Sequence, residues 1–216
     1  MPDLPEGLEL RSDERGLALV GDGLELRGDF SRMASRLRQR NLAHELLVRA
    51  ARVKGVEHPR AVDATAGLGE DALLLAAAGF EVLLCERDAV IAALLADALG
   101  RARTDERMAA VAVRMRLAEG DAVETLAALP EAPDVVYLDP MFPERRRKAA
   151  TNKKLQLFQR LESPCEDEEA LMAAALAAHP RKVVVKRPLK GPYLAGMKPS
   201  SSLTGKVVRY DIYPRG

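Results

Sequence analysis

The stretch from Val135 to Pro143 constrains the fold most, because an apolar strand ends there abruptly in a proline-bounded turn. Residues 135–138 (VVYL) are β-branched, aromatic or aliphatic throughout, which is typical of a strand buried on both faces of a parallel sheet. Residues 139–143 (DPMFP) stop the strand, since proline cannot donate to a ladder and restricts the residue before it. We therefore expect an α/β sheet with polar groups at this strand's carboxyl edge, where open α/β sheets bind ligands.

The groups at that edge predict chemistry on the amino group of a nucleobase. Asp139 and the carbonyl group of Pro140 can accept the two hydrogen bonds of an exocyclic NH2 group, and Phe142 can stack on the base that carries it. Asp139, Pro140 and Phe142 are accordingly the expected catalytic residues. The pattern suits adenine and cytosine as well as guanine, so it does not identify the base.

From residue 60 onward, the sequence alternates between strand and helix patterns. Strands are expected at 61–64, 81–85, 111–117, 135–138 and 181–187, and helices at 71–78, 89–99, 122–129 and 166–179. This alternation predicts a doubly wound, mostly parallel sheet. Residues 191–202 read as a loop, and a last strand at 206–213 follows without an intervening helix. We therefore expect that last strand to be antiparallel.

The residues before this domain predict a small extension. Residues 8–28 alternate leucine with polar residues between glycine-containing turns, which predicts a β-hairpin or meander. Residues 31–54 predict one helix, capped by Ser31 and ended by Gly55, with seven basic residues against Glu45. This basic face is either solvated or a phosphate contact, and the sequence leaves both open. We divide the chain into an extension, 1–55, and a main domain, 56–216.

Composition narrows the class of protein. A chain of 216 residues with 48% hydrophobic residues can form one α/β domain with a sizeable core. The cysteines, Cys85 and Cys165, have no metal-type spacing, and a disulfide is not expected. No secretory signal or membrane-length apolar run is visible. We expect a cytoplasmic protein without a metal ion or a membrane partner.

A glycine-rich loop, Gly67-Leu68-Gly69-Glu70-Asp71-Ala72, formally matches the dinucleotide fingerprint G-x-G-x-x-A. A pyrophosphate needs a positive helix N-terminus, whereas Glu70 and Asp71 place two acids there. S-adenosylmethionine (SAM) has no phosphate, and its cationic sulfonium and ammonium groups suit an acidic pocket. The loop, with Gly67 and Gly69, therefore favours SAM over a dinucleotide. The alternative that the two acids only stabilise the helix N-terminus stays open.

Acidic residues also end four of the predicted strands, which strengthens the case for SAM. Asp63 would lie near the methionine end of the cofactor, Glu86 could bind both ribose hydroxyls, and Asp121 could reach the adenine amine. Asp139 is the fourth acid of this set. Such a set is more specific than the glycine loop, because each parallel strand brings its acid to the same edge of the sheet.

A basic run directly follows Phe142. From Phe142 to Arg160, with Arg160 included, there are seven basic residues and one acid, Glu144. Its position beside the proposed base pocket favours contact with a polyanion over a solvated loop. The expected RNA contacts are Arg145, Arg146, Arg147 and Lys148, extended by Lys186 and Arg187 at the end of the fifth strand.

The chain resembles the bacterial ribosomal RNA small subunit methyltransferase J family. The resemblance rests on residues 62–69 (VDATAGLG), 86–87 (ER), 90–95 (VIAALL), 135–143 (VVYLDPMFP), 183–188 (VVVKRP) and 209–213 (RYDIY). It implies a Rossmann-like class I SAM-dependent methyltransferase that forms N2-methylguanosine in 16S rRNA, free or in the small ribosomal subunit. By the same resemblance, cofactor contacts fall on Glu70, Asp71, Glu86, Arg87, Asp121, Ala122 and Asp139.

Two other classes of function remain open from the sequence. An NAD(P)-dependent oxidoreductase is suggested by the glycine loop alone. A non-catalytic RNA-binding or ribosome-assembly module is suggested by the basic runs. The DPMFP stretch argues against such a module, because simple phosphate binding does not need it.

Overall fold

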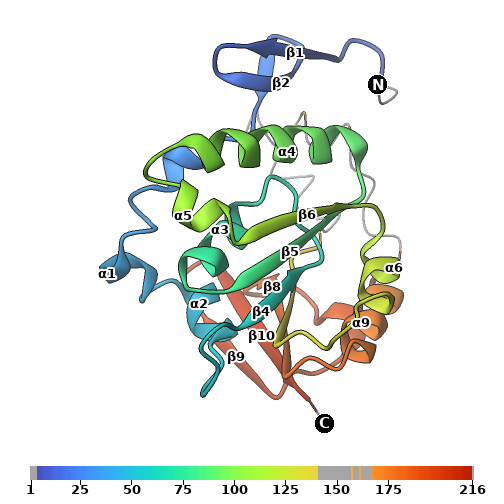
Figure 1. Ribbon diagram of the computed structural model, residues 1–216. Coiled ribbons are helices and arrows are strands. Elements are labelled where there is room, and N and C mark those ends of the chain that lie inside the picture. The colour runs from blue at the N-terminus through green and yellow to red at the C-terminus, as the bar shows by residue number, and fades with distance from the viewer. Residues whose placement is uncertain (1–3, 141–156, 158–160, 162–166, 216) are drawn as a thin grey trace.

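The computed structural model describes residues 4–140, 157, 161 and 167–215, and its centre is a seven-stranded sheet (Figure 1). The strand order is β6-β5-β4-β7-β8-β10-β9. Every described pairing is parallel except those of β10, which runs antiparallel to both neighbours. The predicted fold class and the antiparallel last strand are therefore confirmed. The strands are β4 (Arg60–Asp63), β5 (Glu81–Glu86), β6 (Met115–Glu119), β7 (Val135–Leu138), β8 (Lys182–Pro188), β9 (Ser201–Thr204) and β10 (Val208–Pro214).

Strand β7 has the bounds that the VVYL run predicts, and all four of its residues are buried. It lies between β4 and β8, at the point where the strand order reverses. The loops that follow the strands on the two sides of such a reversal separate from each other. The crevice between these loops is the usual ligand-binding place of a doubly wound sheet. Asp63 pairs with Tyr137 across it, so the ends of β4 and β7 are neighbours.

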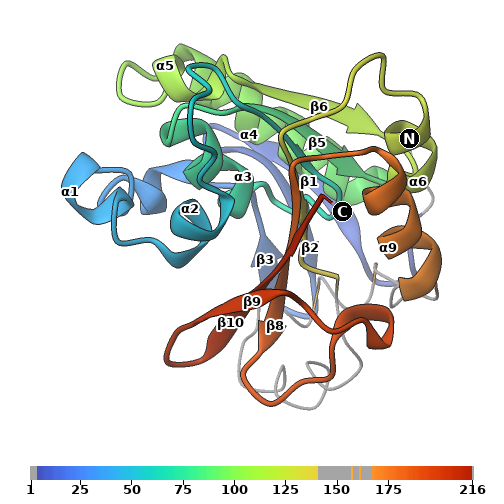
Figure 2. The ribbon, with the colours of Figure 1, turned by 90° about the horizontal axis from the view of Figure 1, so that it is seen from below.

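Helices cover both faces of the sheet (Figure 2). One face packs against α2 (Leu46–Ala51), α3 (Glu70–Ala77), α4 (Ala89–Thr104) and α5 (Ala109–Ala112). The other packs against α6 (Ala122–Ala127), α9 (Glu168–Ala177) and the short 3-10 helix η3 (Leu194–Gly196). Alternate residues of β7 serve the two cores: Tyr137 belongs to the first and Val136 to the second.

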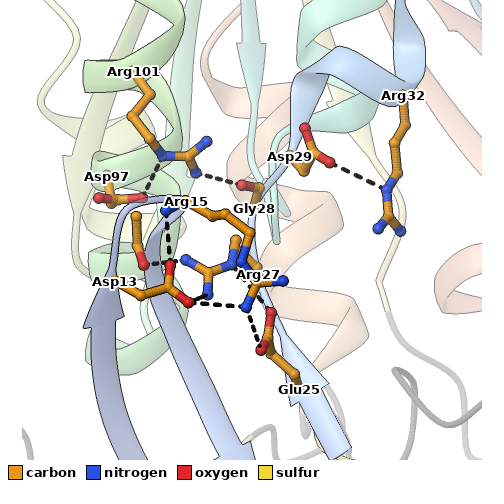
Figure 3. A network of polar contacts seen from close by, with 10 residues as sticks. Asp13, Arg15, Glu25, Arg27, Gly28, Asp29, Arg32, Asp97 and Arg101 are labelled. Atoms are coloured by element: carbon orange, nitrogen blue, oxygen red, sulfur yellow. Dashed lines mark hydrogen bonds and ion pairs between the residues drawn. The ribbon is translucent and has the colours of Figure 1, made fainter.

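A separate antiparallel sheet precedes the main domain, as the alternating leucines predict. It consists of β1 (Glu9–Asp13), β2 (Gly16–Gly21) and β3 (Leu24–Leu26), and its apolar face packs on α4. A polar network borders this contact (Figure 3). Arg101 on α4 donates a 2.6 Å hydrogen bond to the carbonyl of Gly28, and Arg27 donates to the carbonyl of Gly16. The small sheet is thus fastened to α4 by side-chain packing and by Arg101, whereas the Arg27 hydrogen bond lies within the N-terminal segment itself.

The prediction of one helix over residues 31–54 is wrong. The segment forms three short helices, η1 (Phe30–Met33), α1 (Gln39–Leu42) and α2. The residues before α1 and α2, Arg38 and Glu45, have extended ψ angles of 132° and 125°. Polar contacts stabilise these breaks: Asn41 Nδ2 donates to the Ser35 carbonyl at 2.7 Å. The first short helix is capped by Asp29 and not by Ser31.

Other differences concern element boundaries. Helix α4 continues through Gly100 to Thr104, because the buried Leu99 and Ala102 on either side of this exposed glycine hold the helix in the core. The third strand starts at Met115, and residues 109–112 before it are helical. Residues 201–204 form β9 by pairing with β10, although residues 201 and 202 were expected to end a loop.

Candidate active site at the carboxyl edge of the sheet

The four predicted strand-end acids lie along one edge of the sheet. Asp63 ends β4 and Glu86 ends β5, while Asp121 and Asp139 follow β6 and β7. These four strands are mutually parallel, so their carboxyl ends share that edge. The edge therefore gathers the acids as the sequence predicts.

Asp63 is buried, with 1% of its surface exposed. Its Oδ1 accepts a 3.1 Å hydrogen bond from the backbone N–H of Thr65. Burial, reinforced by the negative charge of Asp71, raises the pKa of Asp63 to about 8. Most of this carboxyl group is therefore protonated at neutral pH, so Asp63 contributes little negative charge on its own.

The glycine-rich loop is held by Glu86. One carboxylate oxygen of Glu86 accepts from the N–H of Gly67 at 2.9 Å, and the other accepts from the N–H of Asp88 at 2.8 Å. Burial raises the pKa of Glu86, although these backbone hydrogen bonds oppose the shift. The acid at the end of β5 thus fixes the loop after β4.

Gly69 lets this loop approach its neighbours closely. Its φ is +77°, and a Cβ at this position would lie 2.8 Å from Leu95 Cδ1 and 3.4 Å from Phe30 Cζ. A side chain here would be strained by the backbone and would meet both residues. Gly67 also has a positive φ, +53°.

The remaining predicted cofactor residues follow β4, β5 and β6 at the same edge of the sheet. Glu70 and Asp71 are the first two residues of α3, and Ala122 is the first residue of α6. Asp121 caps α6, because its Oδ1 accepts from the N–H of Val123 at 2.6 Å. Arg87 directly follows β5 and is exposed.

An ion-pair network at this edge was not anticipated. Lys186 Nζ lies 2.7 Å from Asp71 Oδ2 and 2.9 Å from Asp139 Oδ2. The same oxygen of Asp71 accepts a 2.6 Å hydrogen bond from the phenol of Tyr137. The network joins the first turn of α3 to the ends of β7 and β8.

Lys186 and Arg187 were expected to contact RNA, and their surroundings do not fit that prediction. Arg187 is 0% exposed, and its Nε donates to the carbonyl of Pro192 at 2.7 Å. Its burial removes it from any exposed basic patch. Lys186 is committed to two carboxylates, as described above. Both residues end a central strand that is covered on both faces, so the polarity of the KRP sequence did not imply exposure.

The charge of Lys186 follows from the same contacts. Burial alone would lower the pKa of Lys186, but the carboxylates of Asp139 and Asp71 override it and raise the pKa above its ordinary value. For Asp71, burial would raise the pKa, and the charge and hydrogen bond of Lys186 lower it instead. The pair is therefore ionised at neutral pH.

Asp139 is also positioned through its backbone. Its N–H donates a 2.7 Å hydrogen bond to the Thr65 hydroxyl, so the loop after β4 holds the first residue after β7. Pro140 is buried directly beyond it. Phe142 and the basic residues Arg145, Arg146, Arg147 and Lys148 lie outside the described residues.

The parallel register could have revealed the Lys186–Asp139 contact. Tyr137 pairs with Val184, and Leu138 pairs with Val185. Asp139 and Lys186 are therefore the next neighbours along these strands, and side chains of neighbouring strands at one level share a face. The sequence does not state the register, so this signal becomes usable only once the strands are aligned.

The edge fits SAM better than a phosphate-bearing cofactor. The first turn of α3 carries Glu70 and Asp71 and no basic residue, which disfavours a pyrophosphate. Among the residues in the described ranges, no cluster of three or more metal-ligating side chains is found. None of the helices within those ranges is long and apolar enough to cross a membrane.

Comparison with known proteins agrees with this geometry. The family described as "Putative SAM-dependent methyltransferase" matches residues 6–215. The ribosomal RNA small subunit methyltransferase J of Thioalkalivibrio sulfidiphilus is 44% identical over 97% of this chain and 85% of its own length. The protein of the same name from Pseudomonas paraeruginosa is 46% identical over 94% of this chain and 80% of its own.

A solved structure extends the similarity to the fold. The crystal structure of a SAM-dependent methyltransferase from Neisseria gonorrhoeae is 34% identical, with a TM-score of 0.80, and the alignment covers 100% of this chain and 86% of that one. The resemblance seen in the sequence motifs is thereby confirmed over nearly the whole length. The chain belongs to the ribosomal RNA small subunit methyltransferase J family of SAM-dependent methyltransferases.

Proposed function

We propose that this protein transfers a methyl group from SAM to the exocyclic N2 of a guanosine in the 16S rRNA of the small ribosomal subunit. The observation that carries the proposal is the placement of Asp139. It lies at the reversal point of the sheet, anchored by Thr65 and Lys186, beside an edge lined by acids. The choice of guanine N2 and of 16S rRNA rests on membership of the family and not on this geometry.

The residues proposed to hold SAM are those of the acidic edge. Glu86, which already fixes the Gly67 loop, would bind the ribose, and Asp121 would reach the adenine. The loop glycines, together with Glu70, Asp71, Arg87 and Ala122, would complete the pocket. Asp71 and Asp139 together carry one more negative charge than Lys186 neutralises, which suits a cationic ligand. When bound, SAM supplies an electrophilic methyl group on a sulfonium.

In the proposed mechanism, Asp139 and Pro140 orient the amine. The amino group of guanine is a poor nucleophile, because its lone pair is conjugated with the ring. The Asp139 carboxylate and the Pro140 carbonyl oxygen would accept hydrogen bonds from its two N–H groups, which favours a more tetrahedral nitrogen. Phe142 would stack on the base. As the new N–C bond forms and the S–C bond breaks, the Asp139 carboxylate would stabilise the positive charge that develops on N2. The carboxylate would then accept the proton that N2 loses and pass it to water.

We infer that the basic run after Pro143 binds the RNA backbone. Arg145, Arg146, Arg147 and Lys148 follow the proposed base-binding residues within a few positions of the chain. Cations at this place would neutralise phosphates next to the target nucleotide. An RNA substrate of the ribosome also supports the expected cytoplasmic location.

The test of this proposal is nucleoside mass spectrometry of 16S rRNA from a deletion strain. We expect one N2-methylguanosine to be missing, and the purified protein with SAM to restore it. D139N should bind SAM but fail to restore the nucleoside. D134N is the matched control, since Asp134 precedes β7 at the opposite edge of the sheet and should leave transfer intact. An unchanged N2-methylguanosine level in the deletion strain would overturn the assignment.

A further inference from the structure

Lys186 connects two parts of the proposed site that are far apart in the sequence. Asp71 opens the helix after the cofactor loop, and Asp139 follows β7. Lys186 Nζ contacts one oxygen of each, at 2.7 and 2.9 Å. All three side chains are largely buried, with 14% to 21% of their surface exposed. An ion pair this enclosed is screened far less by solvent than a surface pair.

Side chains from several elements surround the ion pairs of Lys186 with Asp71 and Asp139. Tyr137 holds the Asp71 oxygen from the other side, and Thr65 holds the backbone of Asp139. Tyr210 on β10 and the buried Asp63 on β4 also face the ammonium group, and Arg36 faces Asp71 from the segment before α1. Lys186 is the cation that directly pairs both carboxylates within the described part of the chain.

We propose that Lys186 is a positioning residue for methyl transfer: it fixes the orientation of the Asp139 carboxylate and ties it to the start of α3. This inference rests on the proposed function of Asp139. It replaces the phosphate contact that the sequence suggested for Lys186. With one Asp139 oxygen committed to Lys186, the rotation of the carboxyl group is restricted, and its orientation toward an amine is set in advance.

Lys186 does not act as a base in this arrangement. Two carboxylates within 3 Å stabilise the ammonium form, so no lone pair is available at neutral pH. Its effect on the reaction therefore passes through Asp139.

The test compares K186M, which removes the charge and keeps most of the apolar stem, with K186R, which keeps the charge. K182M is the matched control. Lys182 lies on the same strand, and its ammonium donates to the carbonyls of Ala50 at 3.2 Å and Arg52 at 2.9 Å. Both acceptors of Lys182 are neutral backbone carbonyl groups, and Lys182 lies at the end of β8 opposite to Lys186.

Turnover at saturating SAM and RNA is the first readout. We expect K186M to lower kcat by about 100-fold, as misplacement of a reacting group does. K186R, which keeps the charge, should recover most of the turnover, and K182M should leave turnover unchanged.

RNA binding is the second readout, and it distinguishes the rival role. The Kd for 16S rRNA and its dependence on salt should be the same in K186M and the wild type. Weakened RNA binding with a salt slope reduced by about one, at unchanged kcat, would make Lys186 a phosphate contact and overturn the proposal.

Chemical unfolding from pH 3 to 7 tests the ion pairs without any substrate. The stability lost in K186M should grow as the pH rises and Asp71 ionises, because Lys186 lowers the pKa of Asp71, while the loss in K182M should stay constant. A loss in K186M that does not vary with pH would overturn the pairing. If the pH-dependent loss appears but the wild type methylates no 16S rRNA, the proposed function fails while the ion pairing stands.

Discussion

The phenol of Tyr137 donates a 2.6 Å hydrogen bond to Oδ2 of Asp71, the oxygen that also accepts from Lys186. Tyr137 is part of the apolar run of β7, and its ring is buried in the core between the sheet and α3. A strand residue that seemed purely structural thus supports an acid beside the proposed cofactor loop.

Y137F should therefore destabilise the protein by about 1.5–3 kcal/mol, the usual range for a hydrogen bond to a charged group. Y213F is the matched control, because the phenol of Tyr213 donates to the neutral carbonyl of Met197 at 2.8 Å. Its loss should cost about 0.5–1.5 kcal/mol. Urea unfolding at pH 7 measures both values. An equal decrease in the free energy of unfolding in the two variants would show that the charge of Asp71 does not strengthen the hydrogen bond of Tyr137.

The buried carboxyl group of Asp63 should make stability depend on pH. Its pKa is about 8 in the folded protein and near the ordinary 3.8 in the unfolded chain. Between these values the folded state keeps a proton that the unfolded state loses. The free energy of unfolding should thus fall as the pH rises from 4 to 8, by at most about 1.4 kcal/mol per pH unit.

D63N should remove this slope, because asparagine cannot lose a proton and its Oδ1 can still accept from Thr65. Urea unfolding of both proteins at pH 5, 6, 7 and 8 measures the difference. Glu86, whose pKa burial also raises, is present in both proteins and cancels in the comparison. Parallel pH curves would contradict the protonated state of Asp63.

R101M should loosen the N-terminal sheet, because Arg101 joins α4 to the carbonyl of Gly28. Amide hydrogen exchange in residues 16–28 should accelerate by about tenfold, the equivalent of one lost hydrogen bond. R103M is the control. Arg103 lies on the same helix and donates to the carbonyl of Met115 on β6 at 2.8 Å. Faster exchange of residues 16–28 in R103M would show that the effect is not specific to the Arg101 contact.

Replacing Arg145, Arg146 and Arg147 by glutamine should weaken the binding of 16S rRNA and flatten its salt dependence, with the slope falling by up to about three. The control is the same change at Arg107, Arg116 and Arg181, which are exposed and lie near the opposite edge of the sheet. Titrations between 50 and 300 mM salt give both slopes. Identical slopes in the two triple variants would leave the basic run without an RNA contact.

Most of the fold could be predicted from local sequence patterns. The bounds of β7 and the acids at four strand ends follow from short runs, because a doubly buried strand and its polar end leave a clear signature. The helix expected over 31–54 failed for the opposite reason. Its basic and apolar residues have a rough helical period, but Asn41 and Glu45 form contacts that break it.

The site was predictable in its residues but not in their pairing. Asp71, Asp139 and Lys186 were each identified from the sequence, and two of them were assigned to the cofactor. That Lys186 contacts both acids depends on the register of β7 against β8 and on the seating of α3, which are set by tertiary packing. The charge of a residue at a strand end does not show by itself whether the charged group is solvated or forms an ion pair with another residue.

The position of Phe30 under Gly69 bears on how this family can diversify. Phe30 is buried at the start of η1, within the segment that the sequence divides from the main domain, and it is within 3.4 Å of where a Gly69 side chain would begin. Recombination at residue 55 would exchange this ring while leaving the glycine loop in place. The two halves of a chimera would then have to match in the shape of one aromatic ring. A crossover before Phe30 avoids that requirement, because it keeps the ring with the loop it supports.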